Sequence, residues 1–311
     1  MYNDTEDTGD IQSNIFFKIQ IFNLTCFSIT FILGITGNGL VIWIAGFKMK
    51  KTITVVWFLN LAIADFLFNI ILPFQITKLI MDEHWPFGQV MCKVIATVFF
   101  LNMSASTSFL MIISIDRCTS VMCPVWSKNH KSPRLALTIS AIIWFVCFIF
   151  NSPYLAYFNI RHSFDNTTTH CIFLYADDDD TDTMRHQTTI IVRLVFMFLI
   201  PFLLIVICYS LIIFRLRRMR SLSGSTRPLK VIITIVLCFF CFWFPFHAWP
   251  LLDMVDVEMN STFDIVMSSL TFCIGLFNSC VNPIIYVFVG RDFKKSLFRS
   301  IPVLIEDTFK E

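Results

Sequence analysis

The chain has 311 residues, of which 56% are hydrophobic, 16% aromatic and only 15% charged, and its formal net charge is +2. So few charged residues cannot cover a water-soluble globule of this length. The composition therefore excludes a soluble domain and indicates a polytopic membrane protein.

Seven apolar segments are each long enough to cross a bilayer, which takes roughly 20 residues of helix. In chain order they are 19–47, 53–80, 89–122, 135–157, 188–216, 229–255 and 262–289. We therefore expect an all-α membrane protein, a seven-transmembrane helix bundle over 19–289, with an extracellular tail at 1–18. After the seventh helix, 290–311 should form a short amphipathic helix on the cytoplasmic side of the membrane and a brief tail.

The basic residues predict the orientation of the bundle, because Lys and Arg collect in cytoplasmic loops. Eighteen of the 24 basic residues flank the segment ends that face one side, and this count includes Arg117 at the end of the third segment. We therefore expect an extracellular N-terminus and a cytoplasmic C-terminus. Residues 1–10 are acidic and polar and do not resemble a cleavable signal peptide, so the first helix is expected to act as an uncleaved anchor.

Possible glycosylation sites agree with this orientation. Asn3, Asn166 and Asn260 each begin an Asn-X-Ser/Thr acceptor on a segment that the charge pattern places outside. We expect these three asparagines to carry glycans.

Of eleven cysteines, nine fall within predicted helices or on the reducing side of the membrane. Only Cys92, at the start of the third helix, and Cys171, in the second external loop, can face the oxidising exterior. We expect a disulfide between them that pins the loop across the mouth of the bundle. Two free external thiols are the alternative.

Polar side chains near the middle of the apolar segments mark a second kind of site, because an ionisable group in hydrocarbon is costly and usually functional. Asp65, Asn102, Ser106 and Asn278 all fall near mid-membrane, and Ser106 lies one helical turn from Asn102 on the same face. Their oxygen atoms are suited to a small monovalent cation. A purely structural polar network is the alternative.

Several short motifs occur in a specific order and spacing along almost the whole chain. They are Gly37-Asn38, Leu59-Asn60-Leu61-Ala62-Ile63-Ala64-Asp65, Asp116-Arg117-Cys118, Trp144, Pro201, Tyr209, Trp243-Phe244-Pro245 and Asn282-Pro283-Ile284-Ile285-Tyr286. Together they resemble the rhodopsin-like, class A G-protein-coupled receptors. Within that family, His84-Trp85-Pro86-Phe87-Gly88 and Pro124-Val125-Trp126-Ser127-Lys128-Asn129-His130 resemble the leukocyte chemoattractant receptors, most of all the formyl-peptide and chemerin-type receptors.

The resemblance assigns roles to the switch and coupling motifs. It implies that Asp116 pairs with Arg117 at rest, and that Arg117 is freed to meet a G protein as Tyr209 and Tyr286 swing toward it. An arginine that reaches lipid headgroups is the alternative for Arg117.

Further residues complete the expected switch. Trp243 and the helix-kinking Pro245 would form a hinge, with Asn282 and Pro283 in the seventh helix. The resemblance also implies that sodium is the cation near Asp65.

The expected ligand site lies in the outer half of the bundle. Phe99 and Phe100 stand where amine receptors carry an aspartate, so amine ligands are not expected. Two basic residues remain there, Lys78 and Arg193, and the resemblance gives Arg193 the task of binding an anionic ligand end. Internal pairing of Arg193 is the alternative. The expected apolar walls include Phe246, His247 and Trp249.

These features predict a plasma-membrane chemoattractant receptor for a peptide or lipid mediator with an anionic end, coupled to an inhibitory-class G protein. A capturing or orphan receptor with little G-protein output is the alternative, and the absence of inverted repeats disfavours a transporter. The chain shows no nucleotide-binding or nucleophile motif, so no enzyme activity, cofactor or nucleic-acid partner is expected. The short tail, with few phosphate acceptors, predicts weak arrestin recruitment, and its basic residues predict contact with membrane lipid.

Overall fold

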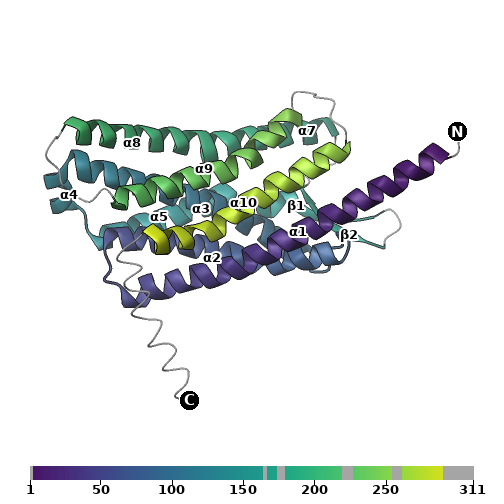
Figure 1. Cartoon of the computed structure of the whole chain (residues 1–311), viewed down its shortest axis with the longest axis horizontal. Coiled ribbons are helices and arrows are strands. Elements are labelled where there is room, and N and C mark those ends of the chain that lie inside the picture. Colours follow the sequence, from purple (N-terminus) through teal and green to yellow (C-terminus); the bar gives the residue numbers. More distant parts are fainter. Residues whose placement is uncertain (1–2, 164–166, 174–178, 219–226, 254–260, 290–311) are drawn as a thin grey trace, which may run out of the picture.

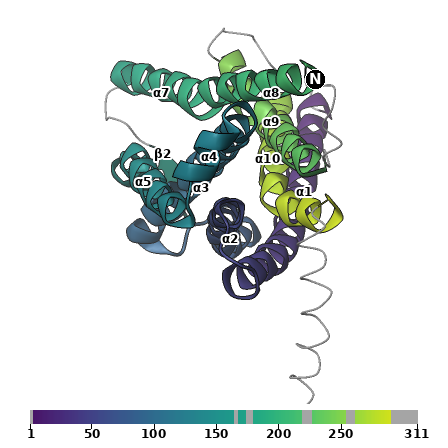
Figure 2. The same cartoon turned by 90° about the vertical axis from the view of Figure 1, so that its left-hand side faces the viewer.

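The computed structural model describes residues 3–163, 167–173, 179–218, 227–253 and 261–289. Long helices run side by side along one axis (Figure 1), and the view along that axis shows them grouped as a bundle (Figure 2). The bundle consists of α1 (Asn3–Trp43) with the π-helical turn η1 (Ile44–Lys48), α2 (Ile53–Ile80), α3 (Gly88–Met122), α5 (Pro133–Asn151), α7 (Asp179–Leu194) continued by η2 (Val195–Leu199) and α8 (Ile200–Arg218), α9 (Arg227–Asp253) and α10 (Ser261–Val289). The predicted seven-helix bundle is confirmed.

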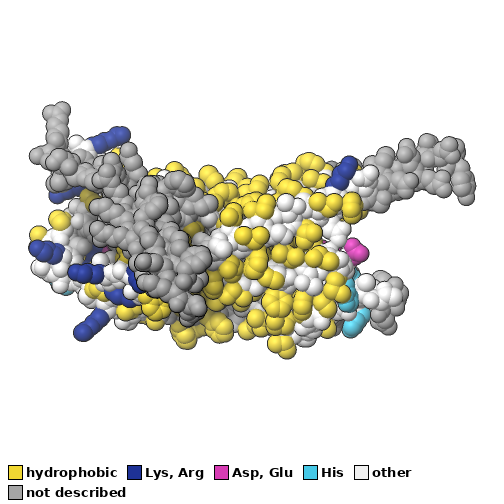
Figure 3. Space-filling model, turned by 60° about the horizontal axis from the view of Figure 1, so that its bottom comes forward, with side chains coloured by type: hydrophobic (Ala, Val, Ile, Leu, Met, Phe, Trp, Pro, Cys, Tyr) yellow, Lys and Arg dark blue, Asp and Glu magenta, His cyan; other side chains and the backbone are white. Residues whose placement is uncertain are grey.

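Length and hydropathy agree with a membrane location. Within the described residues, six helices are long and apolar enough to cross a membrane, and α9 adds a shorter apolar stretch, Val236–Leu252. Many large apolar side chains point outward, for example Phe145, which is 66% exposed, and Phe214, which is 64% exposed. Figure 3 shows hydrophobic side chains over the middle of the visible face, where a lipid bilayer would cover them.

The two ends of the bundle differ in charge. One end carries exposed basic side chains, among them Lys50, Lys128, Arg134, Arg217 and Arg218, and we call it the basic end. The other end holds a disulfide between Cys92 and Cys171, as predicted, and we call it the disulfide end.

Two helices begin earlier than hydropathy suggested. α1 starts at Asn3, so most of the segment expected as a tail is helical, and α7 starts at Asp179, nine residues before the expected segment 188–216. Hydropathy detects only the part of a helix that lipid can cover, whereas the backbone hydrogen-bond ladder continues into polar sequence.

Short elements between the long helices were not predicted. At the disulfide end, β1 (Phe158–His162) pairs antiparallel with β2 (Thr169–Phe173), after the single-turn helix α6 (Tyr154–Tyr157). At the basic end, α4 (Pro124–His130) connects α3 to α5. Each is shorter than about ten residues, so no long hydrophobic period announces it.

Buried polar side chains tie neighbouring helices together. The amide of Asn38 on α1 donates to the carbonyl of Ser279 on α10 at 2.7 Å. The indole nitrogen of Trp144 on α5 donates to Asn60 on α2 at 2.9 Å. Such bonds satisfy polar groups that no water reaches and fix how each helix is rotated about its axis.

Some predictions fall on parts of the chain outside the description. These are the amphipathic helix and tail at 290–311, the side chains of Asn3 and Tyr286, and the glycosylation sites Asn166 and Asn260.

Candidate functional site

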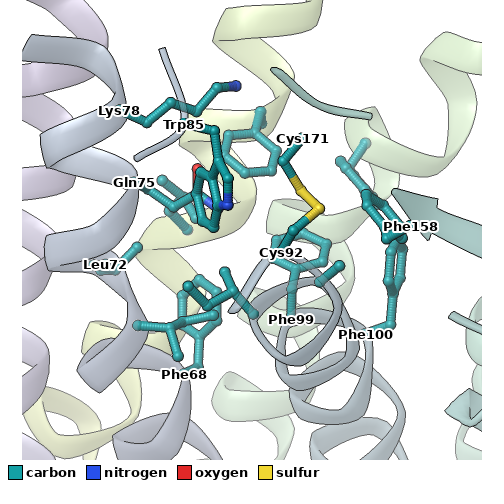
Figure 4. Close-up of a pocket in the computed structure, with 16 residues that line it drawn as sticks. Phe68, Leu72, Gln75, Lys78, Trp85, Cys92, Phe99, Phe100, Phe158 and Cys171 are labelled. Carbon is teal, nitrogen blue, oxygen red and sulfur yellow. A yellow bond between two sulfur atoms is a disulfide. The ribbon is translucent and has the colours of Figure 1, made fainter. Parts of the chain in front are cut away.

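A cavity of about 300 Å³ lies in the disulfide-end half of the bundle. Its walls come from α2, α3, α9, α10, the β hairpin and the turn that holds Trp85, as Figure 4 shows for most of these elements. The side chains are mainly aromatic and aliphatic, and Gln75 and Lys78 supply polar groups. A mostly apolar cavity with few polar groups is typical of a small-ligand site.

Four of the seven predicted ligand residues line this cavity: Lys78, Phe99, Phe100 and Phe246. Phe99 is the central one, because its ring contacts Phe68, Phe100, Trp243, Phe246 and Phe272 at centroid distances of 5.0 to 6.1 Å. A ligand that displaced Phe99 would therefore press directly on Trp243.

The ammonium of Lys78 lies at the rim of the cavity and already has a partner. Its Nζ forms an ion pair with Glu83 at 2.5 Å, and the Lys78 side chain is 25% exposed. An exposed pair of this kind is weak, so an anionic ligand can compete for the lysine.

Arg193 lies beside the cavity wall instead of in it. Its guanidinium carbon is 4.9 Å from the centroid of the Phe246 ring and 5.8 Å from that of Phe100, and both rings line the cavity. The cation therefore stacks on two aromatic rings at the edge of the apolar space.

His247 and Trp249 do not line the cavity. His247 is 1% exposed and packs against Phe198 and Phe246, with ring centroids 5.3 and 5.7 Å away. The indole nitrogen of Trp249 donates to Asp264 at 2.9 Å, which joins the ends of α9 and α10. Both side chains face other neighbours because of how α9 is rotated about its own axis, which the sequence did not reveal.

Several residues of the cavity wall were not predicted from the sequence. Trp85 is 2% exposed, its indole nitrogen donates to the carbonyl of Gly88 at 3.0 Å, and its amide donates to Thr169 at 2.7 Å. Phe158 and Cys171 come from the hairpin. The His84–Gly88 motif was noticed only as a mark of resemblance, although a tryptophan in a short loop is itself a sign of burial.

A second site lies deeper, around Asp65, which is fully buried. One carboxylate oxygen accepts hydrogen bonds from Asn102 at 3.1 Å and Ser106 at 3.3 Å, and the other accepts from Asn282 at 2.8 Å. The structure thus brings together α2, α3 and α10. Three of the four predicted cation ligands meet here, joined by Asn282, which was predicted as a switch residue.

Asn278, the fourth predicted ligand, is 1% exposed. Its amide nitrogen has no hydrogen-bond partner within the described part of the chain. A buried amide without a partner costs free energy.

Trp243 lies between the cavity and the polar core. It is 2% exposed, contacts Phe246 at 5.4 Å between centroids, and packs so closely on Gly275 of α10 that a Cβ there would be 3.3 Å from the indole ring. Two residues later, Pro245 cannot donate a backbone hydrogen bond to the carbonyl of Cys241. A weakened ladder next to a tightly packed indole is the arrangement expected of a hinge.

At the basic end, Asp116 and Arg117 lie close together but do not form a hydrogen bond. The Nε atom of Arg117 is 3.8 Å from an oxygen of Asp116, and an Nη atom donates to Thr54 of α2. Tyr209 is buried, and its hydroxyl has no hydrogen-bond partner among the described residues.

Comparisons with known proteins agree with this geometry. Residues 37–286 match the family model described as 7 transmembrane receptor (rhodopsin family). The chain is 42% identical to the rat (Rattus norvegicus) protein Chemerin-like receptor 1 over 98% of this chain and 85% of the relative. It is 36% identical to the chimpanzee (Pan troglodytes) N-formyl peptide receptor 3 over 94% of this chain and 87% of the relative. It is also 36% identical to the zebrafish (Danio rerio) C3a anaphylatoxin chemotactic receptor, over 99% of this chain and 82% of the relative.

The fold and the family match define a seven-transmembrane receptor, and the chain belongs to the rhodopsin family of G-protein-coupled receptors. Within that family it belongs to the chemoattractant receptor group. It is therefore a multi-pass plasma-membrane protein and not an enzyme, and it has an extracellular agonist and a heterotrimeric G protein as partners.

Proposed function

We propose that this receptor binds a peptide or lipid mediator through its anionic end and activates an inhibitory-class G protein. The observation that carries the proposal is the position of Arg193, stacked on Phe100 and Phe246 at the edge of the cavity. An anionic group that passes these rings gains a charge-assisted hydrogen bond in a site of low polarity. The apolar body of the ligand then fills the space around Phe99.

The experiment is inhibition of cyclic AMP in cells that express the chain. The probes are formylated peptides, chemerin-type peptides and fatty-acid-derived acids, each also tested with its acidic end blocked as an amide or ester. For the active probe we expect Arg193→Ala to raise the half-maximal concentration on the order of 30-fold, the equivalent of about 2 kcal/mol.

In the unchanged receptor, blocking the acid should raise the half-maximal concentration by a similar factor. In the Arg193→Ala variant it should raise that concentration little further, because both changes remove the same interaction. Arg161→Ala, an exposed arginine of β1, is the matched control and should leave the response unchanged. A response that Arg193→Ala does not alter would refute the anchor. Silence to every probe at normal surface expression would favour a capturing or orphan receptor.

We also propose that sodium binds at the polar core and favours the resting state. The carboxylate of Asp65 and the hydroxyl of Ser106 supply oxygen atoms, and the amides of Asn102 and Asn278 supply oxygen after rotation. All four side chains are buried, so a bound ion would neutralise a carboxylate that bulk solvent does not reach.

For the membrane orientation we propose an extracellular disulfide end and a cytoplasmic basic end, supported by the basic residues at one end and the disulfide at the other. On this orientation Asn3, Asn166 and Asn260 are glycosylated, 290–311 lies on membrane lipid, and arrestin recruitment is weak. Loss of a glycosidase-sensitive mobility shift on replacing each asparagine with glutamine tests the orientation.

A further inference from the structure

Lys131, which directly follows α4, is the cation most closely bound to Asp116. Its Nζ atom lies 2.9 Å from a carboxylate oxygen of Asp116 and 2.7 Å from the Asp116 carbonyl. It also donates to the hydroxyls of Thr119 at 2.6 Å and Ser120 at 3.1 Å. An ammonium has three N–H donors, so these four acceptors use all of them.

The two cations next to Asp116 are not equivalent. Lys131 is within hydrogen-bond distance of the carboxylate, whereas the Nε atom of Arg117, at 3.8 Å, is not. The side chains of Asp116 and Lys131 are only 10% and 13% exposed, against 27% for Arg117. The lysine pair is therefore the less screened of the two and the stronger.

We propose that Lys131 competes with Arg117 for Asp116 and so sets how readily Arg117 becomes available to the G protein. Lys131 is thus a positioning residue that acts through Asp116. When its charge neutralises one carboxylate oxygen, the attraction of Asp116 for Arg117 weakens, and Arg117 turns to Thr54 on α2. Among the residues that the structure describes, Arg117 is the cation that remains beside Asp116 when Lys131 is removed, and the resting pair tightens.

The first test is a double-mutant cycle on the thermal unfolding of the purified receptor. Lys131→Gln and Asp116→Asn should each lower the unfolding midpoint. The double variant should lose less than the sum of the two single losses, because the ion pair is shared and is lost only once, while the bonds of Lys131 to the Asp116 carbonyl, Thr119 and Ser120 are lost with Lys131 in either background. Additive losses would overturn the pairing. Lys131→Arg, which keeps the charge, should restore most of the stability.

The second test measures, without agonist, the Kd of the purified receptor for a nucleotide-free inhibitory-class G protein. The use of this class of G protein rests on the proposed function. We expect Lys131→Gln to weaken binding about fivefold and Asp116→Asn to tighten it. Adding Lys131→Gln to Asp116→Asn should then change nothing, whereas a merely structural role would weaken binding in both backgrounds and refute the proposal.

Lys128→Gln, on the exposed side of α4, is the matched control and should behave as the unchanged receptor. Tighter or unchanged binding by Lys131→Gln would also refute the proposal. If no form bound this G protein, the inhibitory-class assignment would fail, and the unfolding cycle would still decide whether Lys131 holds Asp116.

Discussion

At the residue scale, Gly34 shows how closely the helices approach. A Cβ atom at Gly34 would lie within 2.4 Å of the side-chain amide of Asn69, which is fully buried and donates to the Asp65 carbonyl at 2.6 Å. Asn69 also accepts from Ser279 at 3.4 Å, so it has little freedom to move. α1 therefore reaches α2 at this point only because position 34 has no side chain.

We predict that Gly34→Ala lowers the free energy of unfolding by about 1–3 kcal/mol, since overpacking forces buried side chains off their preferred positions. Gly46→Ala is the control, because nothing lies within 4 Å of a Cβ there, and it should be neutral or slightly stabilising. Thermal unfolding of the purified receptors measures both. Equal midpoints for the two variants would contradict the prediction.

Residue types identified much of the polar core, because a carboxylate or amide in an apolar segment is conspicuous. Asp65, Asn102 and Ser106 were singled out from the sequence and meet in the structure. The hydrogen bond of Asn282 to Asp65 was not predicted, since it joins residues 217 positions apart. Lys131 was counted only as one of many basic residues, because nothing in its local sequence indicates a buried partner.

At the element scale, the β hairpin closes one side of the cavity and is held at several points. Besides the disulfide, Gln89 of α3 accepts from the Ile160 amide at 2.9 Å and donates to Asn159 at 2.7 Å. The side chain of His84 accepts from the Thr169 amide at 3.0 Å. The disulfide is the covalent part of this network and spans 79 residues of sequence.

We predict that Cys171→Ser lowers the free energy of unfolding by about 2–5 kcal/mol and weakens ligand binding, because the hairpin gains freedom. Cys123→Ser, an exposed free cysteine at the basic end, should leave both unchanged. Thermal unfolding and binding of the active probe are the measurements. A Cys171→Ser receptor as stable as the control would show that the hydrogen bonds alone hold the hairpin.

Helices were predictable as elements and the short connections were not. The expected segment 53–80 has the same bounds as α2. The hairpin and α4 are too short for a long hydrophobic period to indicate them, and the bonds that hold the hairpin to Gln89 and His84 join residues 70 to 85 positions apart. Local sequence carries little information on such contacts.

At the scale of the whole molecule, Asp65 joins three helices at the centre of the bundle, between the cavity and the basic end. A ligand bound to Asp65 would therefore favour one arrangement of α2, α3 and α10 relative to one another. The proposed sodium ion would thus stabilise one arrangement of the whole bundle.

We predict that replacing sodium with N-methylglucamine lowers the unfolding midpoint of the receptor, by the equivalent of about 1.4 kcal/mol when sodium is at ten times its Kd. Asp65→Asn should abolish the difference between the two salts. Asp264→Asn, which removes a carboxylate bonded to Trp249 at the disulfide end, should retain it. A sodium effect that persists in Asp65→Asn would place the ion elsewhere.

The sequence by itself determined the membrane class, the helix bundle, the disulfide and the family, because a bilayer requires long apolar helices and the motifs lie at family-specific spacings. Only the tertiary structure decided that Arg193 stacks on two rings beside the cavity, that His247 and Trp249 face elsewhere, and that Lys131 binds Asp116. These contacts depend on the rotation of each helix about its axis and on its distance from its neighbours. Both are set by the packing of side chains that lie far apart in the chain.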